Sequence, residues 1–112
     1  MNNTVILVVA KEFSPTPGFR TKEEGPFPAV DFRDQLLFPK LKDAIENDYE
    51  LIVDLDGAAG YGTSFLEEAF GGLIRECKLS YEDIMAHLQL KSEDDPSYIE
   101  EINGYLSDAN NN

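Results

Sequence analysis

The order of apolar and polar residues along the chain predicts strands that alternate with helices. The continuous apolar run at residues 5–10 is typical of a strand covered on both faces. Residues 49–55 predict the next buried strand through Leu51, Ile52, Val53 and Leu55, and residues 88–92 alternate as a half-exposed strand does. We expect residues 5–10 to form the first, central strand. Because helices separate the strands, the predicted fold class is α/β with a mostly parallel or mixed sheet.

The most regular helical pattern lies at residues 64–76. Apolar residues recur there at intervals of three and four positions; they are Leu66, Ala69, Phe70, Leu73, Ile74 and Cys77. Ser64 and Glu67 predict a capping box at the start of this helix, in which the Ser64 hydroxyl accepts from the Glu67 amide. Gly71 and Gly72 each weaken a helix by roughly 1 kcal/mol, so we expect the sheet or a partner's helix to approach their backbone closely.

Three other segments have helical signals. From residue 31 the pattern is helical, but Pro39 should break the helix and start a second piece that ends near residue 47. A short helix is predicted to begin at Ser80, with Asp83 three positions later. The dipeptide Asp95-Pro96 precedes the last predicted helix.

Two loops follow predicted strands. Residues 11–28 are rich in proline and glycine, a composition that forbids a regular helix and permits at most a short edge strand near Phe19. Residues 56–63 join the second strand to the helix at residues 64–76. Ligands of parallel sheets bind beyond the carboxyl ends of the strands, so both loops are candidate binding segments.

Length and charge narrow the classes of function. The 112 residues predict one domain at residues 1–109 with a flexible tail at 110–112. The formal net charge of −13 disfavours direct binding to nucleic acid and to anionic membranes, although an acidic mimic of nucleic acid stays open. Residues 1–22 carry three basic residues against one acidic residue. The basic part of the loop at residues 11–28 is interpreted either as a solvated segment with local ion pairs or as an anion clamp built from Lys11 and Arg20.

The remaining composition predicts a cytoplasmic, non-enzymatic protein. Cys77 is the only cysteine, so an internal disulfide is excluded, and its position on the apolar stripe indicates a core residue. No apolar run is long enough for a membrane span or a signal peptide. His87 is the only histidine and has no partner residues for a metal site or a catalytic triad. We therefore predict no metal and no cofactor.

Candidate chemistry is concentrated in the segment at residues 57–64. Its spacing matches the phosphate-loop motif except that Thr63 stands in place of the lysine. Without that lysine, and with Asp54 and Asp56 nearby, a nucleoside triphosphate would be poorly held. Successive amides at the start of a helix can still hold one phosphate group, either a ligand's or one attached to Ser64 or Thr63. Two alternatives stay open: Ser64 is only a helix cap, and the two aspartates either hold a divalent cation or cap the turn.

Three segments together resemble the STAS-like family of unknown function, whose members are relatives of the STAS domains of bacterial anti-anti-sigma factors. The segments are Lys11-Glu12-Phe13-Ser14-Pro15-Thr16-Pro17-Gly18-Phe19-Arg20, Val53-Asp54-Leu55-Asp56-Gly57 and Gly60-Tyr61-Gly62-Thr63-Ser64-Phe65-Leu66-Glu67-Glu68-Ala69-Phe70-Gly71-Gly72-Leu73. The resemblance implies a mixed sheet of about four strands flanked by helices. It also implies that Ser64 occupies the phosphoacceptor position of anti-anti-sigma factors, with Thr63 beside it. Gly62 and Phe65 depart from the aspartate and glycine of that motif.

The resemblance further implies a partner of the histidine-kinase-like (GHKL) ATPase class. We therefore predict a regulatory protein-binding module, switched by phosphorylation at Ser64 or Thr63, and the sequence leaves a homodimer open. The alternative is a small-ligand sensor or phosphate-handling enzyme that uses residues 57–64 to bind an anion or nucleotide. The predicted binding residues are Arg20, Asp56, Gly60, Tyr61, Gly62, Thr63, Ser64 and Glu67.

Overall fold

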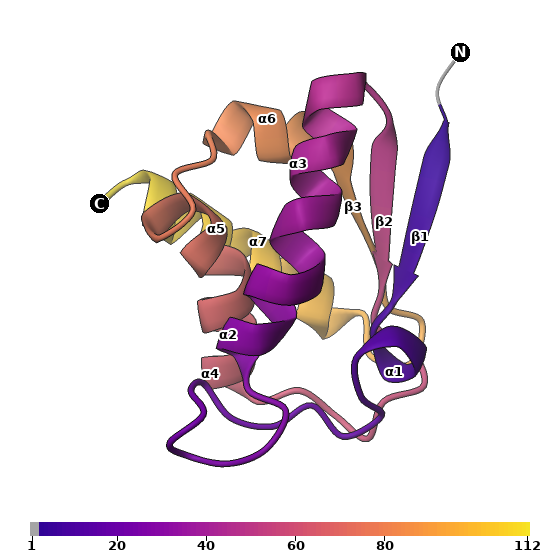
Figure 1. Cartoon of the computed structure of the whole chain (residues 1–112), viewed down its shortest axis with the longest axis vertical. Coiled ribbons are helices and arrows are strands. Elements are labelled where there is room, and N and C mark those ends of the chain that lie inside the picture. Colours follow the sequence, from indigo (N-terminus) through magenta and orange to yellow (C-terminus); the bar gives the residue numbers. More distant parts are fainter. Residues whose placement is uncertain (1–2) are drawn as a thin grey trace.

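The computed structural model describes residues 3–112, and its sheet consists of three parallel strands (Figure 1). The strands are β1 (Thr4–Val8), β2 (Glu50–Asp54) and β3 (Leu88–Lys91), and their spatial order is β1-β2-β3. Each strand is followed by helical structure, as the α/β prediction requires. Two details of that prediction are wrong: the described sheet has three strands instead of about four, and it is parallel instead of mixed.

The first strand also lies at an edge of the sheet, not at its centre. In β1 the Leu7 side chain is fully buried, whereas Val5 and Ile6 are 37% and 55% exposed. The apolar run continues past the strand because Val9, the first residue of the short helix α1 (Val9–Glu12), is buried in the core. Uninterrupted apolarity here reflects core contacts from two consecutive elements, which the sequence pattern cannot distinguish from a strand covered on both faces.

The helices that follow β1 and β2 are long segments with a π-helical turn in the middle. The first consists of α2 (Ala29–Phe32), η1 (Arg33–Leu37) and α3 (Phe38–Asn47), and the second of α4 (Thr63–Leu66), η2 (Glu67–Gly71) and α5 (Gly72–Arg75). The helix continues through Pro39, so the predicted break is wrong, but Pro39 does begin a second helical piece that ends at Asn47, as predicted. Pro39 lies in the first turn of α3, directly after η1, where the wider π-helical turn accommodates the missing proline N–H.

The second of these segments places the predicted apolar stripe in the core. Leu66, Ala69, Phe70 and Leu73 are fully buried, while Ile74 packs at the rim and Cys77 is partly exposed. An aromatic group holds its first turn to the first segment, because the Phe65 ring lies 5.8 Å from that of Phe32. Each such buried aromatic side chain contributes about 1.5–3 kcal/mol of apolar burial.

The last two helices are α6 (Tyr81–His87) and α7 (Ser97–Asn110). The predicted cap of α6 is confirmed, since the Asp83 amide donates to Ser80 Oγ at 3.1 Å. Helix α7 follows Asp95-Pro96 as predicted and extends through Asn110, the first residue of the predicted tail. Among residues 3–112, none of the helices combines the length and apolarity needed to cross a bilayer.

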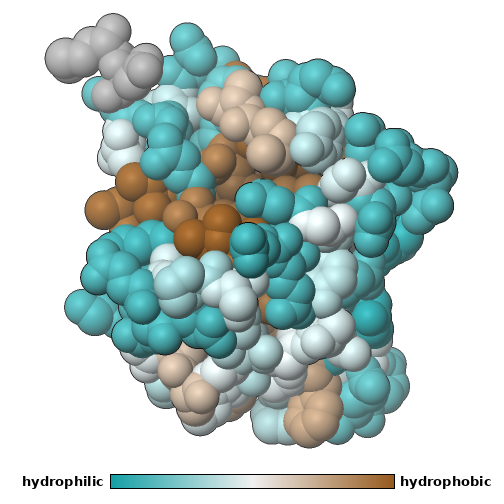
Figure 2. All heavy atoms as spheres, turned by 180° about the vertical axis from the view of Figure 1, so that it is seen from behind, coloured by the Kyte–Doolittle hydropathy of each residue, from teal (hydrophilic) through white to brown (hydrophobic). Residues whose placement is uncertain are grey.

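The two faces of the sheet differ in their covering. Leu51 and Val53 of β2 are buried under the helices, whereas Ile52, between them on the other face, is only half-buried beside the exposed Ile6 and Gln89. Seen from behind, this side of the molecule has a band of apolar side chains between polar ones (Figure 2). A parallel sheet usually has both faces covered, so this exposed face is an uncommon feature of the fold.

Candidate functional site

The segment at residues 57–64, called the glycine turn below, lies between β2 and α4 at the carboxyl ends of the strands. Gly57 has φ of +88° and Gly60 has φ of +151°, which are backbone conformations that favour glycine. The Gly60 position also lies close to α7, because a Cβ there would be 3.7 Å from Tyr98 Oη. The two glycines therefore have a local structural role in shaping the turn.

Several amides of the glycine turn already have partners within the chain. The Gly57 amide donates to Asp94 Oδ2 at 3.0 Å, the Ala59 amide to the Pro15 carbonyl at 2.8 Å and the Tyr61 amide to Tyr98 Oη at 3.2 Å. These three bonds reduce the number of turn amides that a bound phosphate could use. This arrangement weighs against the phosphate-loop interpretation of the turn.

Tyr61 is a structural member of the turn. Its ring is largely buried, and its hydroxyl donates to the Leu55 carbonyl at 3.0 Å. Burial, with the nearby Asp54 carboxylate as a smaller cause, raises the pKa of the Tyr61 phenol. Tyr61 therefore holds the turn against the end of β2, and its predicted binding role stays a prediction.

Ser64 and Thr63 lie at the exposed start of the helix that follows the turn. The predicted capping box is wrong, because Gly62 occupies the N-cap position and Thr63 is the first helical residue. In a capping box the Glu67 carboxylate would also accept from the Ser64 amide, but here it binds two arginines, Arg20 and Arg75. Ser64 is thus an exposed hydroxyl in the first helical turn and not the cap of the helix.

Behind this start lies a group of ion pairs that we call the arginine–glutamate cluster, made of Arg20, Arg33, Arg75, Glu67 and Glu68. Arg20 Nη1 lies 2.7 Å from Glu67 Oε1 and 3.0 Å from Glu68 Oε1, and Arg75 Nη1 lies 2.7 Å from Glu67 Oε2. Although burial raises the pKa of the Glu67 carboxyl, the hydrogen bonds from Arg75 and Arg20 prevail and lower it. The cluster joins the loop at residues 13–28 to the second helical segment.

Arg33 is the innermost residue of the cluster, with a side chain only 7% exposed. Its Nη1 lies 2.6 Å from Glu68 Oε2 and donates to the Glu68 carbonyl at 3.1 Å, within the π-helical turn η2. The guanidinium also lies over Gly72, which explains why a side chain is absent at that position. The close neighbours of the two glycines are therefore neither the sheet nor a partner but side chains of the same chain, Glu67 at Gly71 and Arg33 at Gly72.

No sequence signal identified Arg33, because an isolated arginine in a helical pattern is normally a surface residue. The only indication was that Gly71-Gly72 and Glu67-Glu68 lie in one helix, where a missing side chain and two carboxylates leave space and charge for a basic residue. Arg33 lies in the π-helical turn η1 and Glu68 in η2. Turns of this kind are frequent at functional sites.

Acidic residues of the two helical segments neutralise the basic residues Arg20 and Lys22 of the loop at residues 13–28. Arg20, one half of the predicted anion clamp, is bound to Glu67 and Glu68, and Lys22 Nζ lies 3.5 Å from Asp31 Oδ1. Lys11, the other half, is exposed at the end of α1. For Arg20 and Lys22, the interpretation as local ion pairs is therefore the better description.

Asp54 and Asp56 bind a lysine, and Asp54 caps the turn, as one of the two alternatives predicted, because its Oδ1 accepts from the Asp56 amide at 3.0 Å. Lys91 Nζ lies 2.9 Å from Asp56 Oδ2 and 3.7 Å from Asp54 Oδ2, and the Asp94 amide donates to Asp56 Oδ1 at 2.8 Å. These hydrogen bonds, that from the Asp94 amide first, lower the pKa of Asp56 to about 2. Within residues 3–112 no group of three or more metal-ligating side chains is arranged to share an ion.

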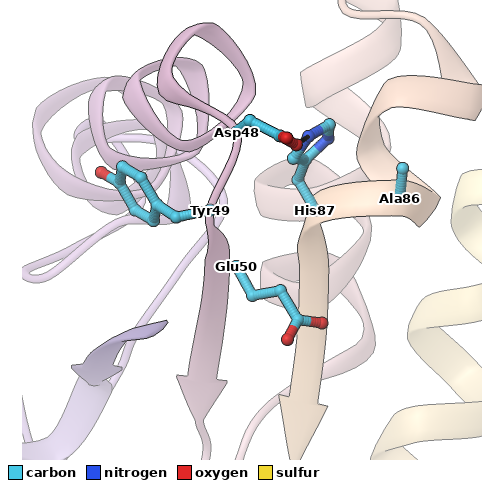
Figure 3. A pocket seen from close by; sticks show the side chains of 5 residues that line it. All are labelled: Asp48, Tyr49, Glu50, Ala86 and His87. Atoms are coloured by element: carbon cyan, nitrogen blue, oxygen red, sulfur yellow. Dashed lines mark hydrogen bonds and ion pairs between the residues drawn. The ribbon is translucent and has the colours of Figure 1, made fainter. Parts of the chain in front are cut away.

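A small polar pocket of about 80 Å³ lies at the opposite end of the sheet (Figure 3). It is lined by residues 48–50 together with Ala86 and His87, and the His87 ring lies beside the exposed Asp48 carboxylate at 3.3 Å. The hydrogen bond to the Asp83 carbonyl, with Asp48 as a smaller cause, raises the pKa of His87. Because the ring joins the ends of two helices, its role is structural.

The comparisons with known proteins support the family. The model of the STAS-like domain of unknown function (DUF4325) matches residues 29–98, which include β2, β3, both π-helical turns and the glycine turn. The chain belongs to this family of STAS-like domains. A search of curated proteins and a search of solved structures find no match.

Proposed function

We propose that this chain is a regulatory protein-binding module whose contact surface is the glycine turn and the exposed start of the following helix. The observation that carries the proposal is that, among residues 3–112, the polar groups on this surface are free of ion pairs, whereas those behind it are not. Ser64 and Thr63 are exposed, while Glu67, Arg20 and Asp56 directly behind or beside them are engaged in internal ion pairs. The surface offers hydroxyl groups on a rigid support without an activated nucleophile or an acid–base pair.

Cys77 provides no catalytic alternative. Burial raises the pKa of its thiol, whereas a nucleophilic cysteine needs a lowered pKa. The aspartates near the turn are held in ion pairs with Lys91. These contacts favour binding over catalysis as the function of the site.

The proposal includes regulation by phosphorylation at Ser64 or Thr63, with a GHKL-type ATPase as the partner. A phosphate at the start of the helix would be favoured by the helix dipole. Ser64 and Glu67 are three positions apart and therefore neighbours on the helix surface. A phosphate on Ser64 would thus compete with Glu67 for Arg20, and so would alter the link between the helix and the loop at residues 13–28.

The alternative of an anion sensor is less well supported. The Gly57 amide and Arg20 would both have to exchange an internal carboxylate for the ligand. Such an exchange costs the energy of the internal hydrogen bond at Gly57 and of the internal ion pair at Arg20, in addition to that of ordering the ligand.

The test is capture of partners from the native host by the tagged chain, with two matched variants. Ser64→Glu places charge on the proposed surface, and Ser80→Ala removes a hydroxyl from the start of another helix. We expect the wild type and Ser80→Ala to retain the same partner, identified by mass spectrometry, and Ser64→Glu to lose at least tenfold in affinity for it. Equal binding by all three chains would contradict the proposed surface.

A further inference from the structure

The outer edge of β3 presents backbone groups that no strand pairs with. The Leu55 amide donates to the Lys91 carbonyl at 2.8 Å, so the backbone groups of Lys91 point toward β2. Since successive residues of a strand point their backbone groups to opposite sides, those of Leu88 and Leu90 point away from the sheet. The Leu88 amide closes helix α6 by donating to the Ile84 carbonyl. The Leu88 carbonyl and both backbone groups of Leu90 thus face the open edge within the described part of the chain.

An apolar groove runs beside this edge. It has a volume of about 150 Å³, and its lining comes from α6, β3 and α7; the residues are Met85, Leu88, Leu90, Ile99, Asn103 and Leu106. Met85 at its rim is 44% exposed. Edge and groove together have the two parts of a strand-binding site, namely main-chain hydrogen bonds and space for alternate side chains.

The elements around the groove are strongly acidic. Residues 79–112 contain eight acidic residues and one basic residue, Lys91. That lysine is already bound to Asp56 and Asp54. A segment that enters the groove therefore meets a negative potential, which favours lysine and arginine at its solvent-facing positions.

The other edge of the sheet also has outward-facing backbone groups at Ile6, but it differs in the Val8 amide and in its charge. There the Val8 amide, which points outward from β1, is already bonded to the Glu12 carboxylate at 2.8 Å. The strand itself carries no charged residue and belongs to the basic segment at residues 1–22. The asymmetry favours β3 as the edge that is used.

We infer that the β3 edge and its groove bind an extended segment of a partner protein, in which apolar residues alternate with lysine or arginine. The segment adds a fourth strand to the sheet through the Leu88 carbonyl and the Leu90 backbone, and its apolar side chains enter the groove. Its positive side chains face the acidic surroundings. This surface shares no residue with the glycine turn and does not depend on the function proposed there.

The test uses isotope-labelled full-length chain and a ten-residue synthetic peptide of alternating valine and lysine. We expect saturable binding by nuclear magnetic resonance, with at least tenfold slower hydrogen exchange at the Leu90 amide. Two further peptides are N-methylated at every second residue, one in each register. One register removes the amides that face β3 and should abolish binding, while the other should leave it unchanged. A peptide of alternating valine and glutamate should not bind.

Two exposed apolar residues provide the matched variants. Met85→Lys places charge at the rim of the groove and should weaken binding of the valine–lysine peptide at least fivefold, whereas Ile6→Lys at the β1 edge should not change it. Absence of binding, equal binding by both N-methylated peptides or a loss confined to Ile6→Lys would overturn the inference. Self-association of the peptide-free chain that is abolished by Met85→Lys would assign the groove to a second copy instead.

Discussion

The guanidinium of Arg33 lies against the backbone of Gly72, where a Cβ would come within 2.4 Å of Arg33 Nη1. Arg33 belongs to η1 and Gly72 directly follows η2, so this contact joins the two helical segments at their π-helical turns. The side chain of Arg33 then reaches Glu68, which lies next to Glu67 and one helical turn beyond Ser64. The helix that carries the proposed contact surface is therefore held in place by a buried ion pair.

Substitution of Gly72 tests this contact directly. We expect Gly72→Ala to destabilise the fold by about 1–3 kcal/mol, because the added methyl group displaces the buried arginine. Gly104→Ala is the matched control, since Gly104 is also helical and a Cβ there meets nothing within 4 Å. Its expected effect is a stabilisation of roughly 0.5–1 kcal/mol. Urea unfolding followed by circular dichroism measures both, and equal effects would show that Arg33 moves aside freely.

Removal of the Arg33 charge should be more costly than removal of an exposed one. Arg33→Met leaves the Glu68 carboxylate, whose side chain is 13% exposed, without its closest partner. Loss of one member of a buried pair costs roughly 3–5 kcal/mol, and because Arg20 stays 3.0 Å from Glu68 Oε1 we expect a loss at the lower end of this range. Arg75→Met is the control, because that side chain is 40% exposed and such a pair contributes at most about 1 kcal/mol. The comparison needs only the midpoints of denaturant unfolding. A smaller loss for Arg33→Met than for Arg75→Met would disagree with the central place given to Arg33.

The ion pair between Asp56 and Lys91 predicts a specific dependence on pH. The pKa of Asp56 is lowered to about 2 in the folded chain from its ordinary value of 3.8. A lowered pKa contributes stability that is present above the unfolded value and is lost as the pH falls through the folded value. The difference in stability between the wild type and Asp56→Asn should therefore be constant near neutral pH and shrink between about pH 4 and pH 2. Thermal unfolding across this range measures it, with the exposed Asp108→Asn variant as the control.

The observed helix starts predict that substituting Ser80 and Ser64 by alanine will change the free energy of unfolding by different amounts. Ser80 caps α6 through the Asp83 amide, so Ser80→Ala should cost about 1 kcal/mol. Ser64 lies inside the first helical turn, and Gly62 holds the cap position. Ser64→Ala should consequently change the free energy of unfolding by less than roughly 0.5 kcal/mol, as for an ordinary surface position. Equal losses would restore Ser64 as a cap.

Local patterns in the sequence determined a large part of this architecture. The stripe that includes Leu66, Phe70 and Leu73 identified a buried helix, because its spacing matches one helical face regardless of what covers it. The cap between Ser80 and Asp83 was predictable for the same reason, since both residues lie within one turn. The two later strands were also recognisable from their apolar content.

Tertiary structure decided the features that depend on residues far apart in the chain. Glu67 could bond the Ser64 amide or reach an arginine, and only the fold brings Arg20, 47 positions away, to its carboxylate. Likewise the edge position of β1 depends on which strands pair, and the apolar sequence of β1 does not indicate which strands lie beside it. Periodicity and short-range hydrogen bonds depend on residues within one or two turns, so the sequence predicts them. Which charged groups pair and which strands are neighbours depends on residues that only the folded chain brings together.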